Sequence, residues 1–75
     1  MELNEFLKNF AECFDDTDAS QITASTAFRE LDEWSSLTGM SVIAMAKTVY
    51  GKTISGMELR SCETVESLFK LISSK

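Results

Sequence analysis

The sequence predicts an all-α fold: a small four-helix bundle, in which three longer helices and one short helix form a single domain over residues 1–75. Three observations predict it. The chain has the length of one domain. Apolar residues recur at helical spacing in several separate stretches. Residues that favour helix caps stand where those stretches begin and end, so the elements can be placed one by one.

The first helix is expected at about residues 2–14. Its apolar residues at helical spacing are Leu3, Phe6, Leu7, Phe10 and Phe14. Polar residues occupy the other face, so this helix is amphipathic. The acidic run at 15–18, "DDTD", should end it, because acids are unfavourable at the negative end of a helix and common in turns.

Residues 15–35 form a long connection. It is polar at first and then carries Ile22, Phe28, Leu31 and Trp34. A structureless loop of this length is uncommon inside a compact domain. We therefore expect the spaced apolar residues to attach the connection to the core through a short helical turn.

The second helix is expected at residues 36–50, and Gly51 should end it as a left-handed cap. It is apolar almost all round, as in a helix that is central to the core or that offers an apolar face to a partner. The side chains expected on its buried side are Leu37, Met40, Ile43, Ala44, Ala46 and Tyr50. Those expected on its exposed side are Ser41, Val42, Met45 and Thr48.

Two further helices complete the bundle. Ser55 and Glu58 have the spacing of a capping box, which predicts a short helix at about 56–62. Thr64 is a suitable cap for the last helix, at about 65–73. The apolar stripe of that helix is Val65, Leu68, Phe69 and Ile72.

Composition narrows the class of function. The net charge is −5 and the isoelectric point about 4.5, which argues against nucleic-acid binding because phosphate contacts need clustered bases. Residues 1–33 hold nine acids and two bases, a charge of −7, whereas residues 34–75 hold three acids and five bases, a charge of +2. The acidic half could steer a basic partner, or it could simply be solvated surface.

The two cysteines are expected to be small core residues. Cys13 and Cys62 have no close cysteine or histidine, so a zinc site is not expected. The N-terminus has no apolar signal-peptide core, and no apolar run approaches the length of a membrane span. We expect a cytoplasmic monomer with reduced thiols.

The segment "DEWSSL", residues 32–37, contains the residues most able to carry a function. Ser35 or Ser36 could cap the second helix. Alternatively, Ser36 could be exposed so that a group can be attached to it. No histidine or other base lies nearby in sequence, so Ser36 is not an activated nucleophile, and another enzyme would have to activate it.

The ordered motifs from residue 28 to residue 72 resemble those of the acyl carrier protein family. The family has a long loop, a Ser-Leu pair that opens helix two, an aromatic-small pair that closes it, a short helix, and a Thr-Val pair that opens the last helix. The matching pairs here are Ser36-Leu37, Tyr50-Gly51, Ile54-Ser55 before the short helix, and Thr64-Val65. The set covers nearly the whole chain at family spacing.

The resemblance implies a carrier that is not itself an enzyme. A phosphopantetheinyl transferase would attach 4′-phosphopantetheine from coenzyme A to Ser36, and the arm would carry acyl or aminoacyl groups as thioesters. Acyl- or aminoacyl-activating and transferring enzymes would be the other partners. The residues implied for an acyl pocket are Ile43, Ala46, Tyr50, Leu59, Cys62 and Leu68, although ordinary core packing is the stronger explanation for each one individually.

The sequence departs from the family pattern in two places. Ser35 stands where the family has an aspartate, a carboxylate that Asp32 or Glu33 could replace. The second helix contains no acid, whereas family members have acids on its exposed face. These departures, with "WSSL" itself, favour a specialised lipid, polyketide or surface-polysaccharide pathway over housekeeping fatty-acid synthesis. The residues expected to recognise partners are Asp32, Glu33, Trp34, Leu37, Met40, Val42 and Met45.

One alternative class stays open. The chain could be a non-catalytic helical interaction module whose apolar second helix binds a partner helix without any covalent modification.

Overall fold

Four α-helices and two 3-10 helices make up the structure, a computed structural model that describes residues 2–75. The α-helices are α1 (Leu3–Ala11), α2 (Ser36–Tyr50), α3 (Gly56–Ser61) and α4 (Val65–Ser73). The 3-10 helices are Ala19–Gln21 and Phe28–Glu30, both in the connection between α1 and α2. The described part of the chain contains no strand, which confirms the predicted small helical bundle.

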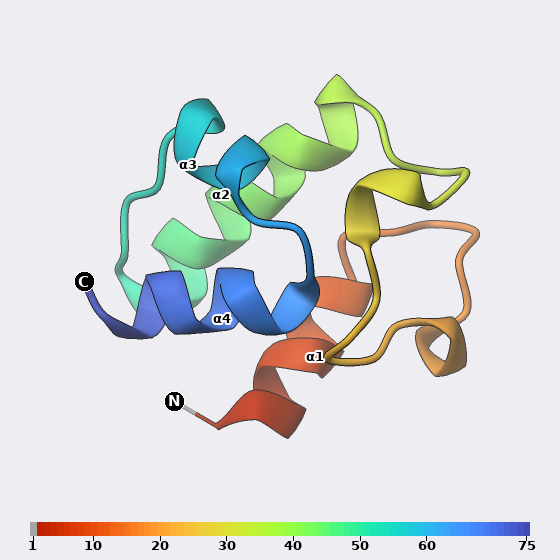
Figure 1. Cartoon of the computed structure of the whole chain (residues 1–75), viewed down its shortest axis with the longest axis horizontal. Coiled ribbons are helices and arrows are strands. Elements are labelled where there is room, and N and C mark those ends of the chain that lie inside the picture. The colour runs from red at the N-terminus through yellow and green to blue at the C-terminus, as the bar shows by residue number, and fades with distance from the viewer. Residues whose placement is uncertain (1) are drawn as a thin grey trace.

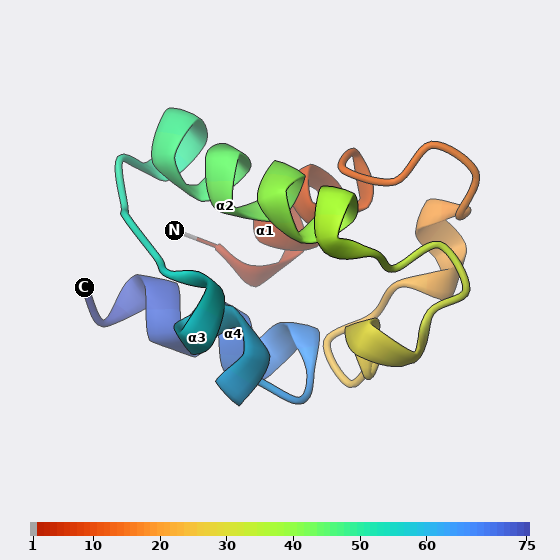
Figure 2. The same ribbon diagram turned by 90° about the horizontal axis from the view of Figure 1, so that it is seen from above.

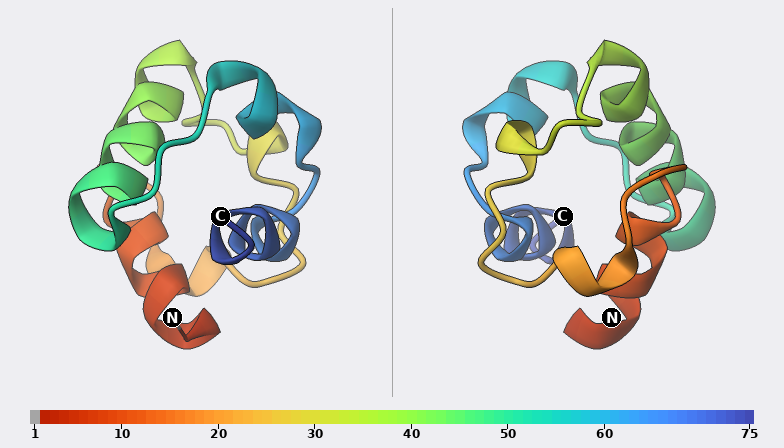
Figure 3. Two further views of the ribbon diagram at one scale, coloured as in Figure 1. Left: turned by 90° about the vertical axis from the view of Figure 1, so that its left-hand side faces the viewer. Right: turned by 90° about the vertical axis from the view of Figure 1, so that its right-hand side faces the viewer.

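The helices enclose one core. α2 packs against both α1 and α3, and α4 packs against α1 (Figure 1). The connection between α1 and α2 forms one end of the molecule, and both chain ends lie at the other end (Figure 2). Views along the length of the molecule show the elements arranged around its centre (Figure 3).

Aromatic side chains dominate that core. Its largest fully buried side chains are Phe6, Phe10, Phe28, Val42, Val65, Leu68 and Ile72. The ring of Phe10 lies 5.4 Å from Phe14 and 5.6 Å from Phe28, measured between centroids. Such tilted and edge-on pairs are favourable beyond the area that they bury. They attach α1 directly to the connection.

α1 is shorter than the predicted 2–14, because it ends at Ala11. The chain continues in a tighter turn, in which the amides of Cys13 and Phe14 donate to carbonyls three residues back, each at 3.0 Å. This turn still brings Phe14 into the core, where it is 6% exposed. The apolar spacing therefore identified Phe6, Phe10 and Phe14 as buried, whereas Leu3 and Leu7 are half-buried, and it overestimated the length of the helix.

The connection is attached to the core as expected. Ile22 and Phe28 are buried. Its backbone also pairs with the start of α4: the Val65 amide donates to the Thr26 carbonyl at 3.1 Å, and the Glu66 amide to the Ala24 carbonyl at 2.8 Å. These two bonds satisfy amide groups that the first turn of a helix leaves free.

α2 has the predicted bounds, and Gly51 ends it with φ 67°, in the left-handed region, as predicted. Its buried face, however, differs from the prediction. The buried residues are Thr38, Gly39, Val42, Met45 and Ala46. Leu37 and Met40, expected on the buried side, are 74% and 66% exposed, and Ala44 is also exposed. Ile43 and Tyr50 are half-buried.

This orientation places Gly39 against Leu59 of α3 and against Trp34. A side-chain Cβ built at this glycine would lie 3.4 Å from a methyl carbon of Leu59 and 3.5 Å from the indole of Trp34. The small residue therefore faces α3. Because apolar residues surround the helix on every side, their spacing could not identify this face.

α3 and α4 begin with the predicted caps. Ser55 and Glu58 form a complete capping box, and Thr64 forms another with Ser67. α3 ends one residue earlier than predicted, at Ser61. Cys62 is buried, as expected, whereas Cys13 lies half-buried at the edge of the core, and both are free thiols. No helix within residues 2–75 has both the length and the apolar character needed to cross a membrane.

Candidate functional site

The two serines of "WSSL" have different roles. Ser35 is extended and caps α2: its Oγ accepts the Thr38 amide at 3.3 Å. Ser36 is the first residue of α2 and is exposed. Within residues 2–75, none of the side-chain hydrogen bonds involves its hydroxyl. Of the two serines that could cap α2, the structure therefore identifies Ser35 as the cap.

An open groove lies beside Ser36, between the first half of α2 and α3. Its volume is about 360 Å³. Its lining residues are Trp34, Ser35, Ser36, Gly39, Met40, Ile43, Gly56, Leu59 and Arg60. The lining is mostly apolar, with the serines at its α2 end and a single charged side chain, Arg60. Such a groove could hold an extended, largely apolar group attached at the serine.

Each of the two helices that border the groove contributes a glycine to its lining. Gly39 lies between Trp34 and Leu59, at the distances given above, so any larger side chain there would fill the space between them. Gly56, at the start of α3, has nothing within 4 Å of a built Cβ. A glycine in the second turn of an otherwise good helix costs about 1 kcal/mol relative to alanine. That cost was the sequence signal that could have indicated a groove here.

The residues predicted for an acyl pocket do not all line one cavity. Ile43 and Leu59 line the groove. Ala46, Cys62 and Leu68 are buried in the core. Tyr50 lies elsewhere: its hydroxyl accepts a hydrogen bond from the Asn9 amide at 2.8 Å, and its ring packs on Phe6. The predictions missed Gly39, Gly56 and Arg60.

Of the residues predicted to recognise partners, some are exposed and others are buried. Leu37 and Met40 are exposed, and Asp32 is exposed beside them in sequence. The expectation that Val42 and Met45 are exposed is wrong, since they are 0% and 9% exposed within the core. Another exposed apolar side chain was missed: Met57 at the start of α3, 76% exposed.

Trp34 lies half-buried at the entrance of the groove. Its ring packs edge-on against Phe28, with centroids 5.0 Å apart, and is tilted against Phe14 at 6.2 Å. The indole thus connects the segment before Ser36 to the aromatic core, as the sequence predicts.

Glu33 faces away from the serines. Its carboxylate accepts hydrogen bonds from the Asp15 amide, from the Asp16 amide at 2.9 Å and from the Thr17 hydroxyl at 2.7 Å. The bond from the Thr17 hydroxyl, helped by those from the backbone, lowers the pKa of this carboxyl below its ordinary value. Glu33 therefore does not replace the missing aspartate at position 35.

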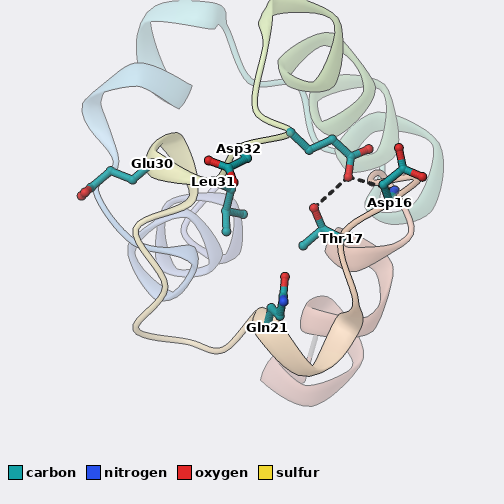
Figure 4. Close-up of a pocket in the computed structure, with 7 residues that line it drawn as sticks. Asp16, Thr17, Gln21, Glu30, Leu31 and Asp32 are labelled. Atoms are coloured by element: carbon teal, nitrogen blue, oxygen red, sulfur yellow. Dashed lines mark hydrogen bonds between the residues drawn. The ribbon is translucent and has the colours of Figure 1, made fainter.

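These residues border an acidic hollow of about 480 Å³ on the connection. Figure 4 shows Asp16 and Thr17, each joined by a dashed line to the same carboxylate, with Glu30, Asp32 and Gln21 around the hollow. Within residues 2–75, no three histidine, cysteine, aspartate or glutamate side chains are placed so that they could hold a metal ion together, and this includes the acids around the hollow.

The charge next to the groove has the opposite sign. Arg60 is exposed in the groove wall. The ion pair of the described chain joins Lys75 to Glu58 at 2.8 Å, so the neighbouring acid of α3 is already occupied. The first turn of α2 has no acid. Arg60 is therefore the one charged side chain among the residues that line the groove beside Ser36.

Comparisons with protein-family models, with curated proteins and with solved structures find no significant match for this chain.

Proposed function

We propose that this protein is a carrier of the acyl carrier protein type, with 4′-phosphopantetheine attached to Ser36. The observation that carries the proposal is the division of labour between the serines. Ser35 caps α2, which leaves the exposed Ser36 hydroxyl free at the rim of an apolar groove. The resemblance of the ordered motifs from residue 28 to residue 72 supports the same conclusion.

The surroundings of Ser36 fit the chemistry of the arm. Its phosphodiester would be an anion at the positive end of the α2 dipole, with Arg60 in the same groove and no acid in the first turn. The apolar walls at Met40, Ile43 and Leu59 suit the less polar remainder of the arm and its cargo. When bound, the arm supplies a terminal thiol that holds an acyl or aminoacyl group as a thioester.

Activation of Ser36 belongs to the transferase. No general base is available within the site, so the transferase removes the hydroxyl proton. Oγ then attacks the phosphorus of coenzyme A that bears the pantetheine. A new Oγ–P bond forms, the bond to the second phosphate breaks, and adenosine 3′,5′-bisphosphate leaves. The carrier contributes an accessible, oriented hydroxyl.

Partner enzymes would dock next to that hydroxyl. Exposed Leu37 and Met40, with Met57 on α3, offer an apolar contact on a surface whose helix carries no acid. Asp32 is the exposed acid nearest in sequence. Partner enzymes of housekeeping fatty-acid synthesis bind carriers whose second helix is acidic, so they suit this surface poorly. An activating or transferring enzyme of a specialised lipid, polyketide or polysaccharide pathway suits it better.

Intact mass spectrometry tests the proposal. The purified protein is incubated with coenzyme A, Mg²⁺ and a phosphopantetheinyl transferase of broad specificity. The wild type should gain one phosphopantetheinyl group, Ser36→Ala none, and Ser35→Ala most of the wild-type amount, because it loses only a cap. A group found on Ser35, or on neither serine, contradicts the proposal.

The exposed apolar side chains favour one other candidate. Leu37, Met40 and Met57, each at least 66% exposed, could bind a partner helix in an interaction module without modification. That function predicts no mass gain under the same conditions, so the one experiment separates the two candidates.

A further inference from the structure

Glu33 joins three parts of the chain at one residue. Its carboxylate holds the loop after α1, through Asp15, Asp16 and Thr17. Its backbone carbonyl accepts the Thr38 hydroxyl at 3.0 Å, in the first turn of α2. We call these four hydrogen bonds the Glu33 latch. They lie three residues before Ser36.

The residues between Glu33 and Ser36 are also fixed. Trp34 packs on the core aromatics. The Ser35 hydroxyl oxygen accepts a hydrogen bond from the Thr38 amide, and the Thr38 hydroxyl donates one to the Glu33 carbonyl. Glu33, Ser35 and Thr38 therefore form a closed set of contacts around the start of α2. The carboxylate of Glu33 is the only part of this set that reaches the loop at 15–17.

The surroundings of Glu33 favour its ionised carboxylate. The acids Asp16, Glu30 and Asp32 border the same hollow, but three hydrogen bonds reach the Glu33 carboxylate. A carboxylate, which only accepts, is suited to all three donors. A glutamine would turn its amide hydrogens toward at least one donor, so it could not keep the set.

We propose that Glu33 is the positioning residue that sets how Ser36 is presented to the transferase. This inference rests on the proposed function and adds a residue that acts through Ser36 without touching the arm. Without the carboxylate bonds, the segment from Asp32 to Ser35 loses its attachment to the loop at 15–17 and is held only by Trp34 and by the Thr38 contacts, so it can take more positions. A smaller fraction of molecules then presents the hydroxyl correctly, and the rate of loading falls with that fraction.

Two variants separate positioning from charge. Glu33→Gln removes one negative charge and breaks at least one of the three carboxylate bonds of the latch, while the backbone bond to Thr38 remains. Glu30→Gln removes one negative charge from the same hollow, and its side chain makes none of the hydrogen bonds found within residues 2–75. Electrostatic steering would slow both variants alike and would weaken in salt. Positioning predicts a loss for Glu33→Gln alone that persists at high ionic strength.

The experiment measures kcat/KM of phosphopantetheine transfer at two ionic strengths, for proteins that circular dichroism shows to be folded. We expect Glu33→Gln to load about tenfold more slowly than the wild type, and Glu30→Gln to stay within about twofold. Thr17→Val removes one latch donor and no charge, so it should fall between them. The double variant Glu33→Gln, Thr17→Val should be no slower than Glu33→Gln, because both changes break the same set of contacts.

Two readouts distinguish positioning from lost stability. Amide exchange should become faster at Asp15 and Asp16 in Glu33→Gln and stay unchanged in Glu30→Gln. The loading defect should also persist well below the melting temperature, whereas a defect in the folded fraction would disappear on cooling.

Loading of Glu33→Gln at the rate of Glu30→Gln overturns this role while leaving Ser36 as the attachment site. Absence of loading in the wild type overturns the proposed function and the role of Glu33 together.

Discussion

Trp34 contributes to stability and to the site at the same time. Its ring packs against Phe28 and Phe14, and the same indole lies 3.5 Å from the Cβ position of Gly39. Truncating a buried tryptophan typically costs 3–5 kcal/mol. Because this ring is half-buried, we expect Trp34→Ala to cost about 2–3 kcal/mol in urea unfolding.

Met57→Ala is the matched control, since it removes an apolar side chain that is 76% exposed. It should change the free energy of unfolding by less than about 0.5 kcal/mol. A loss below about 1 kcal/mol for Trp34→Ala would mean that the ring contributes to partner contacts and little to the fold.

We expect Gly39 to deepen the groove and to lower the stability of the protein relative to an alanine at the same position. A methyl group there would meet Leu59 and Trp34 at ordinary contact distance, without a clash. Gly39→Ala should therefore stabilise the protein by about 0.5–1 kcal/mol through helix propensity. It should also make the groove shallower, so that an apolar acyl group on the arm raises the melting temperature less than it does in the wild type.

Gly51→Ala supplies a control of opposite sign. Its φ of 67° is strained for alanine, and the variant should lose about 1 kcal/mol. Destabilisation by Gly39→Ala in thermal melts would show that Trp34 and Leu59 cannot accommodate even a methyl group.

At the scale of the elements, α2 shows why position and orientation are separate problems. Its limits follow from local chemistry, a serine cap at one end and a left-handed glycine at the other, and the sequence contains both. Its orientation depends on tertiary contacts, such as those of Gly39 with Leu59 and Trp34. Apolar periodicity identifies a face only where polar residues occupy the opposite side, as they do in α1 and α4.

This rotation reverses an expectation about two methionines. Met45 is 9% exposed and Met40 is 66% exposed. Met45→Ala should cost about 2–4 kcal/mol, as for a core methionine, and Met40→Ala less than about 0.5 kcal/mol. Both free energies come from urea melts. Equal costs would mean that α2 is oriented differently, with both side chains at the surface of the core.

In the candidate site, too, some features could be predicted from the local sequence and others depend on tertiary contacts. The sequence contains the signals for an exposed serine at the start of a helix and for the Thr64 and Ser55 caps, all of them local. It contains no local signal for the Glu33 latch, whose donors lie 16 to 18 residues away in sequence. Arg60 was missed for the same reason, since only the packing of α3 on α2 brings it to the groove of Ser36.

At the scale of the whole molecule, charge separates along the fold. Residues 1–33 carry a charge of −7 and include most of the connection that forms one end of the molecule (Figure 2), whereas residues 34–75 carry +2 and include all the residues that line the groove. Of the acids near Ser36 in sequence, Glu33 is held by the latch, which leaves Asp32 as the exposed one. We therefore expect any electrostatic guidance of partners to come from the connection, whereas the groove has Arg60 as its one charged lining residue.

Stability should also depend on pH at both ends of the range. Glu33 is hydrogen-bonded by Thr17, and Glu58 by Lys75 and the capping box, and both pKa values lie below the ordinary 4.5. Burial, with the nearby charge of Glu12, raises the pKa of Cys13 from 9.0 to about 11.

The direction of each effect follows from which state binds the proton more tightly. For a lowered carboxyl pKa, the stabilisation is complete above pH 4.5, and it disappears as the pH falls through the folded value. For the raised thiol pKa, the stabilisation is complete below pH 9.0, and it disappears as the pH rises toward about 11. The melting temperature should therefore have a plateau between about pH 5 and pH 9 and should decrease on either side. Calorimetry across this range checks the profile, with Glu33→Gln and Glu58→Gln flattening the acid side and Cys13→Ala the alkaline side. An alkaline decrease that is unchanged in Cys13→Ala would show that the half-buried thiol of Cys13 does not determine it.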